Sequence, residues 1–148
     1  MNTIHKIIRT GPRLFLGLVF IVFGLNFFLH FMPTPPAPPR GAAFAGALFA
    51  SGYLFPLVAA TQVVAGLLLV SNRFVALTLT VLAPIVINIV GFHLFLAPSG
   101  LGLALALLAS ELALAWNHRA AFAPMLRPRV TLARETIFAA NQPTRKTA

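Results

Sequence analysis

The chain has 148 residues, of which 59% are hydrophobic and 9% charged, and its formal net charge is +9. Only three charged residues, Arg40, Arg73 and Glu111, lie between Leu14 and Asn117. This distribution excludes a soluble domain, which would need a charged surface over its core. The absence of cysteine excludes thiol redox chemistry, iron–sulfur ligation and thiolate zinc sites within this chain.

The positive charge indicates membrane topology and attraction to anionic lipid headgroups, because the basic residues flank apolar stretches. A nucleic-acid partner is therefore not predicted. We predict an all-α integral membrane protein, a four-transmembrane-helix bundle whose main partner is the lipid bilayer.

Four apolar stretches are long enough to cross about 30 Å of hydrocarbon at 1.5 Å per residue. The first follows basic residues as in a signal peptide, but no small-x-small cleavage site follows it, so we expect it to be retained. The predicted spans are residues 14–32, 53–70, 74–96 and 100–116. Together they form a predicted transmembrane domain over residues 1–118, followed by a basic cytoplasmic tail over 119–148.

The connection between the first two spans is the only long one. It begins as a proline-rich segment at Pro33 and continues as an apolar stretch, 41–50, that is too short to span. We predict a short helix at the membrane interface there, separated from the second span by Ser51 and Gly52. The other connections are short, so neighbouring helices should be antiparallel.

The first predicted span carries a stripe of small residues. Gly17 and Gly24 are seven residues apart and therefore lie on one face of a helix. Small residues let helix backbones approach closely in a bilayer, so this face should pack against another span. The phenylalanine-rich patches of the same span suggest lipid-facing or inter-helix surfaces.

Arginine and lysine are distributed unequally between the two sides of a four-span protein. Ten fall on the side of the two termini, and only Arg40 falls on the other. The positive-inside rule then predicts a multi-pass membrane protein with both termini in the cytoplasm. The proline-rich loop is predicted to lie outside.

Five polar side chains are candidates for a pocket that binds a ligand or cofactor. The rise per residue places Gln62 near the midplane, and places Asn26 and Asn88 about one turn toward the outside. His30 and His93 should lie roughly two turns outward. No metal site is predicted among these residues.

Alternatives remain open for each of these residues. The simplest interpretation of the three amides is hydrogen bonding between helices, and that of the two histidines is an interfacial position with one nitrogen in water. The matched depth of His30 and His93 also suits a quinone headgroup site or two axial haem ligands. Of these two candidate cofactors, we expect quinone rather than haem.

Glu111 is the only acid inside the predicted spans, and lies within roughly one turn of the midplane on the cytoplasmic side. An ionised carboxylate there would cost several kcal/mol, because no lysine or arginine is predicted at that depth to pair with it. We expect the neutral acid, hydrogen-bonded to Gln62 or Asn88. A structural role and a role in proton handling both remain open.

The sequence resembles the DoxX family of small four-span bacterial membrane proteins over nearly all of Leu14–Met125. The motifs that carry the resemblance are Phe23-Gly24-Leu25-Asn26, Ser51-Gly52-Tyr53, and Gln62-Val63-Val64-Ala65-Gly66-Leu67-Leu68-Leu69 followed by the basic turn at Arg73. Many family members carry glutamate where this chain has Gln62, which leaves Glu111 as the sole intramembrane acid. The family name comes from a subunit associated with a thiosulfate:quinone oxidoreductase, so the resemblance implies a link to membrane redox systems. It also implies a place in the bacterial cytoplasmic (inner) membrane. It supplies no catalytic residues.

Three functions follow from these observations. The preferred one is an accessory or ligand-binding subunit of a quinone-linked membrane oxidoreductase system, with oxidoreductase subunits or a second copy of the chain as partners. The second is a membrane oxidoreductase that uses bound quinone or haem, with His30 and His93 as ligands or hydrogen-bond donors and Glu111 as proton relay. The third is a small-molecule or proton transporter, against which the lack of a detectable internal repeat counts. Whether the protein is an enzyme stays open.

Overall fold

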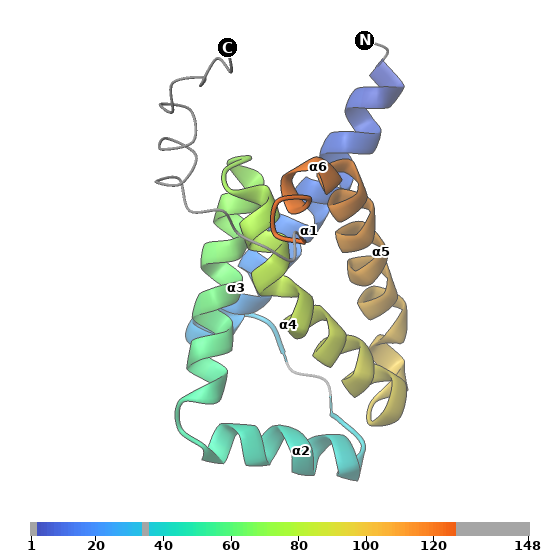
Figure 1. The fold of residues 1–148 in the computed structure, drawn as a ribbon. Helices are drawn as coiled ribbons and strands as arrows, with labels where there is room; N and C mark the ends of the chain where they lie inside the picture. The colour runs from blue at the N-terminus through green and yellow to red at the C-terminus, as the bar shows by residue number, and fades with distance from the viewer. Residues whose placement is uncertain (1–2, 34–35, 127–148) are drawn as a thin grey trace, which may run out of the picture.

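The computed structural model describes residues 3–33 and 36–126, with side chains described from Thr10 onward. These residues form helices joined by turns and short extended segments, and contain no strand, which confirms the predicted all-α class. The helices are α1 (Thr3–Leu29), α2 (Pro39–Ala50), α3 (Leu54–Val70), α4 (Val75–Phe95), the short 3-10 helix η1 (Pro98–Gly100), α5 (Leu101–Asn117) and α6 (Arg119–Phe122). Figure 1 shows α1, α3, α4 and α5 together as a bundle, with α2 lying across one end. Most of the predicted tail over 119–148 lies outside the described residues.

Within residues 3–33 and 36–126, three helical segments are long and apolar enough to cross a membrane, namely Thr10–Leu29, Val75–Phe95 and Pro98–Asn117. The pair α2 and α3, bent by 90° at the break between them, counts as a fourth if it is taken as one span. Large apolar side chains cover the outside of these helices; Ile87 is 64% exposed and Phe95 is 74% exposed. A surface of this kind belongs in lipid, so the chain is a multi-pass membrane protein.

Helix α1 differs most from its predicted span. It begins at Thr3, eleven residues before the predicted start, because the basic residues mark where hydrocarbon begins and not where the helix begins. It ends at Leu29, three residues before the predicted end. The reason is local: the backbone N–H of Met32 donates to the side-chain oxygen of Asn26 at 2.6 Å, which turns the chain out of the helix. The ends of α3, α4 and α5 lie within one residue of the predictions.

The connection between α1 and α3 contains the predicted short helix. Helix α2 has 12 residues and ends at Ala50, with Ser51 as its C-cap. The chain then turns through Gly52, whose φ is +77°. Glycine adopts this left-handed conformation without a steric penalty. The turn sends α3 off at 90° to α2, so α2 lies crosswise at the end of the bundle (Figure 1).

Glycines bring α1 and α3 into backbone contact. A Cβ placed on Gly66 of α3 would lie 2.6 Å from the carbonyl oxygen of Gly17, and one on Gly24 would lie 2.8 Å from the carbonyl oxygen of Ala59. The predicted packing role of the Gly17 and Gly24 stripe is confirmed, and its partner is α3. This is the most extensive helix pairing in the described part of the chain.

Arg13 adds a polar link between the same two helices. Its guanidinium donates to the backbone carbonyls of Leu69 and Val70, at 2.7 Å and 3.2 Å. These carbonyls belong to the last turn of α3 and have no partner within that helix. A side chain of α1 therefore completes the end of α3.

All four long helices contribute to one buried core. Its members are large aliphatic side chains together with one phenylalanine, and they are almost fully removed from the surface. The most buried are Leu16, Phe20, Leu69, Leu82, Val86 and Leu114.

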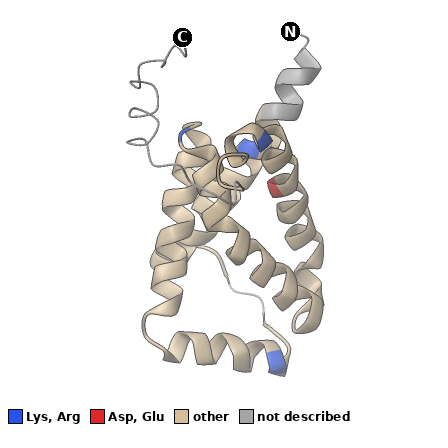
Figure 2. Cartoon of the chain, in the orientation of Figure 1, with Lys and Arg blue, Asp and Glu red and all other residues tan. Residues whose placement is uncertain are grey.

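The described charges separate along the bundle. Arg73 lies in the turn between α3 and α4, and Arg119 lies just after α5, whereas Arg40 lies at the start of α2. Arg13 contacts the last turn of α3 and so lies at the same end as Arg73. Figure 2 shows the blue segments gathered at that end of the bundle, with one at the opposite end, on α2. Glu111 lies in the second half of α5 (Leu101–Asn117), toward the end of the bundle that carries the three arginines. We call this the basic end of the bundle.

Candidate functional site

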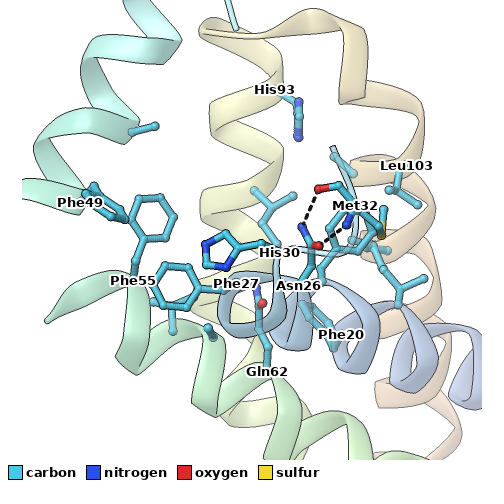
Figure 3. Close-up of a pocket in the computed structure, with 18 of the residues that line it drawn as sticks. Phe20, Asn26, Phe27, His30, Met32, Phe49, Phe55, Gln62, His93 and Leu103 are labelled. Carbon is cyan, nitrogen blue, oxygen red and sulfur yellow. Dashed lines mark hydrogen bonds between the residues drawn. The ribbon is translucent and has the colours of Figure 1, made fainter. Parts of the chain in front are cut away.

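A cavity of about 650 Å³ lies at the end of the bundle nearest α2. Its size is within the range of small-molecule sites in proteins. Four of the five predicted pocket residues line it: Asn26, His30, Gln62 and His93. The remaining lining is almost entirely apolar, and Figure 3 shows the polar side chains distributed among these apolar groups.

Aromatic side chains from three helices form one wall of the cavity. The rings of Phe27 and Phe55 are stacked, with centroids 5.9 Å apart and planes inclined by 13°. Phe49 of α2 lies against Phe55 at a centroid distance of 6.2 Å. Such a wall offers a flat apolar surface to a ring-shaped ligand. The sequence pattern did not single out these residues, because nothing in it separates Phe27 from its exposed neighbour Phe28.

Asn26 is the residue that shapes the end of α1. Its side-chain oxygen accepts from the N–H of Met32 and its amide nitrogen lies 3.5 Å from the Met32 carbonyl oxygen. His30 follows the helix with φ of 51°, a left-handed conformation of the kind that ends helices. The prediction that Asn26 bonds to another helix is wrong, since its partner is in its own segment. Its side chain closes the turn that contains His30.

Hydrogen-bonding capacity at the cavity rests on His30, Gln62 and His93. Within the described residues, no hydrogen bond is formed by the side chains of His30 and Gln62, so both can serve a ligand. The Nδ1 atom of His93 lies 2.8 Å from the carbonyl oxygen of Ala97. A neutral imidazole donates there and keeps Nε2 as an acceptor. The ring also lies against Gly100, where an added Cβ would collide with it.

Asn88 is not among the residues that line the cavity. Its side chain is exposed on α4, and its amide nitrogen lies 3.5 Å from the carbonyl oxygen of Pro84 in the same helix. Five residues separate it from His93, which rotates it by roughly 140° around the helix. The predicted inter-helix hydrogen bond of Asn88 is therefore wrong, and the structure does not bring Asn88 together with the other four candidate residues.

Glu111 is buried in the bundle, with 6% of its surface exposed. Its Oε1 atom has no hydrogen-bond partner among the described residues, so the predicted bond to Gln62 or Asn88 is wrong. Gln62 faces the cavity and Asn88 faces outward. Leu107, one turn earlier on the same face of α5, does line the cavity. Glu111 thus lies one helical turn beyond the cavity, toward the basic end.

The chain was compared with known proteins in three ways. No protein-family model matches it, and no curated protein or solved structure matches it either. Within the described ranges, no group of three or more histidine, aspartate or glutamate side chains is placed to hold a metal ion. The interpretation of the site therefore rests on its own geometry, and the resemblance to the DoxX family stays a prediction.

Proposed function

We propose that the protein is a four-span, DoxX-like protein of the bacterial inner membrane that binds a quinone-like ligand. In this role it serves as an accessory or ligand-binding subunit of a membrane oxidoreductase system. The observation that carries the proposal is the cavity, which combines an aromatic wall with polar groups in an otherwise apolar lining. This is the combination that a flat, lipid-soluble ring with polar substituents requires.

The polar groups match both forms of a quinone. The oxidised ring carries two carbonyl oxygens, which can accept hydrogen bonds from the amide of Gln62 and the imidazole of His30. The reduced ring carries hydroxyl groups, and the acceptor Nε2 of His93 suits such a donor. Glu111, one turn beyond Leu107, is the group that we propose to exchange protons with the cavity.

In the proposed topology, four helices cross the membrane as antiparallel spans, namely α1, α3, α4 and α5. Helix α3 has 17 residues and a length of about 25 Å, close to the thickness of the hydrocarbon. The 90° bend prevents α2 from extending it through the bilayer, so α2 lies in the plane of the outer interface. There Arg40 at its start can reach the headgroups.

The topology can be tested with single cysteines, because the wild-type chain contains none. Ala37 precedes α2 and Asn72 lies in the turn between α3 and α4, and both side chains are exposed. We expect an impermeant maleimide added outside intact cells to label Ala37→Cys but not Asn72→Cys. Permeabilised cells should show labelling of both. Labelling of Asn72→Cys in intact cells would contradict the proposed orientation.

Ligand binding can be tested by filling the cavity. Gly46 of α2 lines it, and a Cβ at this position meets no atom within 4 Å. We expect Gly46→Phe to occupy the ligand space and to weaken binding of a short-chain quinone at least tenfold, measured by calorimetry in detergent. Gly102→Phe is the matched control, since Gly102 also has open space around it but lies outside the cavity.

A second pair of variants tests the polar groups. Gln62→Leu removes an amide inside the cavity and should weaken quinone binding, whereas Asn88→Leu removes an exposed amide outside it and should not. Equal affinity in wild type and all four variants would contradict the proposed site. A Soret band in the purified protein, with no quinone in its lipid extract, would favour the haem alternative instead.

A further inference from the structure

A second hollow lies on the outside of the bundle, between α3 and α4. It is a groove of about 330 Å³ and does not share residues with the quinone cavity. Its lining consists of small and branched side chains, namely Ala60, Thr61, Val64, Ala65 and Leu68 of α3 and Leu77, Thr78 and Val81 of α4.

The groove offers only apolar surface, despite its two threonines. The hydroxyl of Thr61 donates to the carbonyl oxygen of Leu57 at 2.8 Å, and that of Thr78 donates to the carbonyl oxygen of Phe74 at 3.0 Å. Both hydroxyl hydrogens are therefore used within their own helices. Val64 and Leu77, which are 57% and 58% exposed, form its open rim. An occupant of this groove must be apolar.

The length of the groove matches one leaflet of a bilayer. Along α3 it runs from Ala60, near the middle of the helix, to Leu68, in its last turn. Eight residues of helix correspond to about 12 Å, close to half of the hydrocarbon thickness. A helix from a second copy of the chain would pack along both leaflets, whereas a single acyl chain ends near the midplane.

A cation stands at the end of the groove nearest the membrane surface. Arg73 is exposed in the turn that joins α3 to α4, four residues before Leu77. Among the described residues its guanidinium has no hydrogen-bond partner. Arg13 and Arg119 at the same end are both engaged, the first with the end of α3 and the second over the ring of Trp116. Arg73 is therefore available to an anionic headgroup.

We infer that this groove binds one acyl chain of an anionic phospholipid from the leaflet at the basic end, with the phosphate on Arg73. The apolar lining, the one-leaflet length and the cation at the surface end carry this inference together. The site is independent of the quinone cavity, so the failure of one proposal leaves the other standing.

The headgroup contact can be tested by native mass spectrometry of the purified full chain titrated with phosphatidylglycerol or phosphatidylcholine. We expect wild type to bind one phosphatidylglycerol more tightly than phosphatidylcholine. Removal of one cation, in Arg73→Gln, should weaken phosphatidylglycerol binding by roughly fivefold and phosphatidylcholine binding by less, because the choline cation offsets the charge of its phosphate. Arg40→Gln is the matched control, because Arg40 is exposed at the opposite end of the bundle. Equal losses in the two variants would overturn a specific contact at Arg73.

The acyl contact requires a different change. Ala60 is exposed at the rim, so the ring in Ala60→Phe should fill the groove. We expect this variant to bind phosphatidylglycerol and phosphatidylcholine several-fold more weakly, with no change in melting temperature. Ala106→Phe, at an exposed alanine of α5 outside the groove, should have no effect. Unchanged lipid binding in Ala60→Phe would overturn the acyl site. Disulfide-linked dimers of Val64→Cys formed in native membranes would overturn it as well, in favour of a second copy of the chain.

Discussion

Glu111→Leu is expected to stabilise the folded bundle by about 1–3 kcal/mol, because it removes a buried polar group without a partner and adds apolar burial. The basis is the Oε1 atom, which is enclosed by the bundle and bonded to none of the described residues. The measurement is the free energy of unfolding in detergent. Ser110→Leu is the control on the same helix; the Ser110 hydroxyl already donates to the carbonyl oxygen of Ala106, so its loss should change stability little.

Glu111→Leu is also expected to abolish the function of the protein if Glu111 exchanges protons with the cavity. Glu111→Gln keeps the size and the neutral polarity of the protonated acid but cannot transfer a proton, so it should fold normally and fail to complement a strain lacking the gene. Natural proteins keep unpaired buried groups of this kind when function requires them, at a cost in stability. Destabilisation by Glu111→Leu, together with full complementation by Glu111→Gln, would instead assign Glu111 a structural role.

Gly66→Val should be the most damaging single change in the described core. A Cβ on Gly66 would lie 2.6 Å from the carbonyl oxygen of Gly17 and 3.0 Å from the backbone nitrogen of Ile21. Both are backbone atoms of α1, so the overlap can be relieved only if the two helices move apart. Separation of α1 from α3 should cost about 3 kcal/mol or more. The expected result is aggregation or a strongly lowered melting temperature of the detergent-purified protein.

Gly91→Val controls for the effect of a β-branched residue within a helix. Gly91 lies in α4, and a Cβ at this position meets no atom within 4 Å. Its variant should therefore keep the stability of the wild type or gain slightly, because valine has a somewhat higher helix propensity than glycine. Comparable loss of stability in Gly66→Val and Gly91→Val would show that backbone contact between α1 and α3 does not hold the bundle together.

The sequence alone predicted the helices well, because apolar stretches and turn residues act locally. Ser51 and Gly52 were expected to separate a short helix from the next span, and α2 ends there. The spacing of Gly17 and Gly24 predicted a packing face. Its partner, Gly66, could not be predicted, because the choice of neighbour depends on how four similar apolar helices arrange themselves.

The candidate site was predicted less completely, since depth along a helix does not fix the direction in which a side chain points. His30 and His93 were expected at matched depth, and they do line one cavity. Asn88 was assigned to the same pocket on its depth, but its position around α4 turns it outward. The partner of Asn26 was also missed, because its bond to Met32 forms only once α1 has ended.

The pairing of α1 with α3 sets an order of events during biosynthesis. Gly17 and Gly66 are separated by 49 residues, which a ribosome adds in roughly 2–10 s. Throughout that interval the glycine face of α1 has no partner, and the guanidinium of Arg13 lacks the carbonyls of Leu69 and Val70 that it later binds. The first helix must therefore wait in the insertion machinery or in lipid until the third emerges. The step that commits the nascent chain to its native bundle therefore comes only after the residues of α3 have been translated.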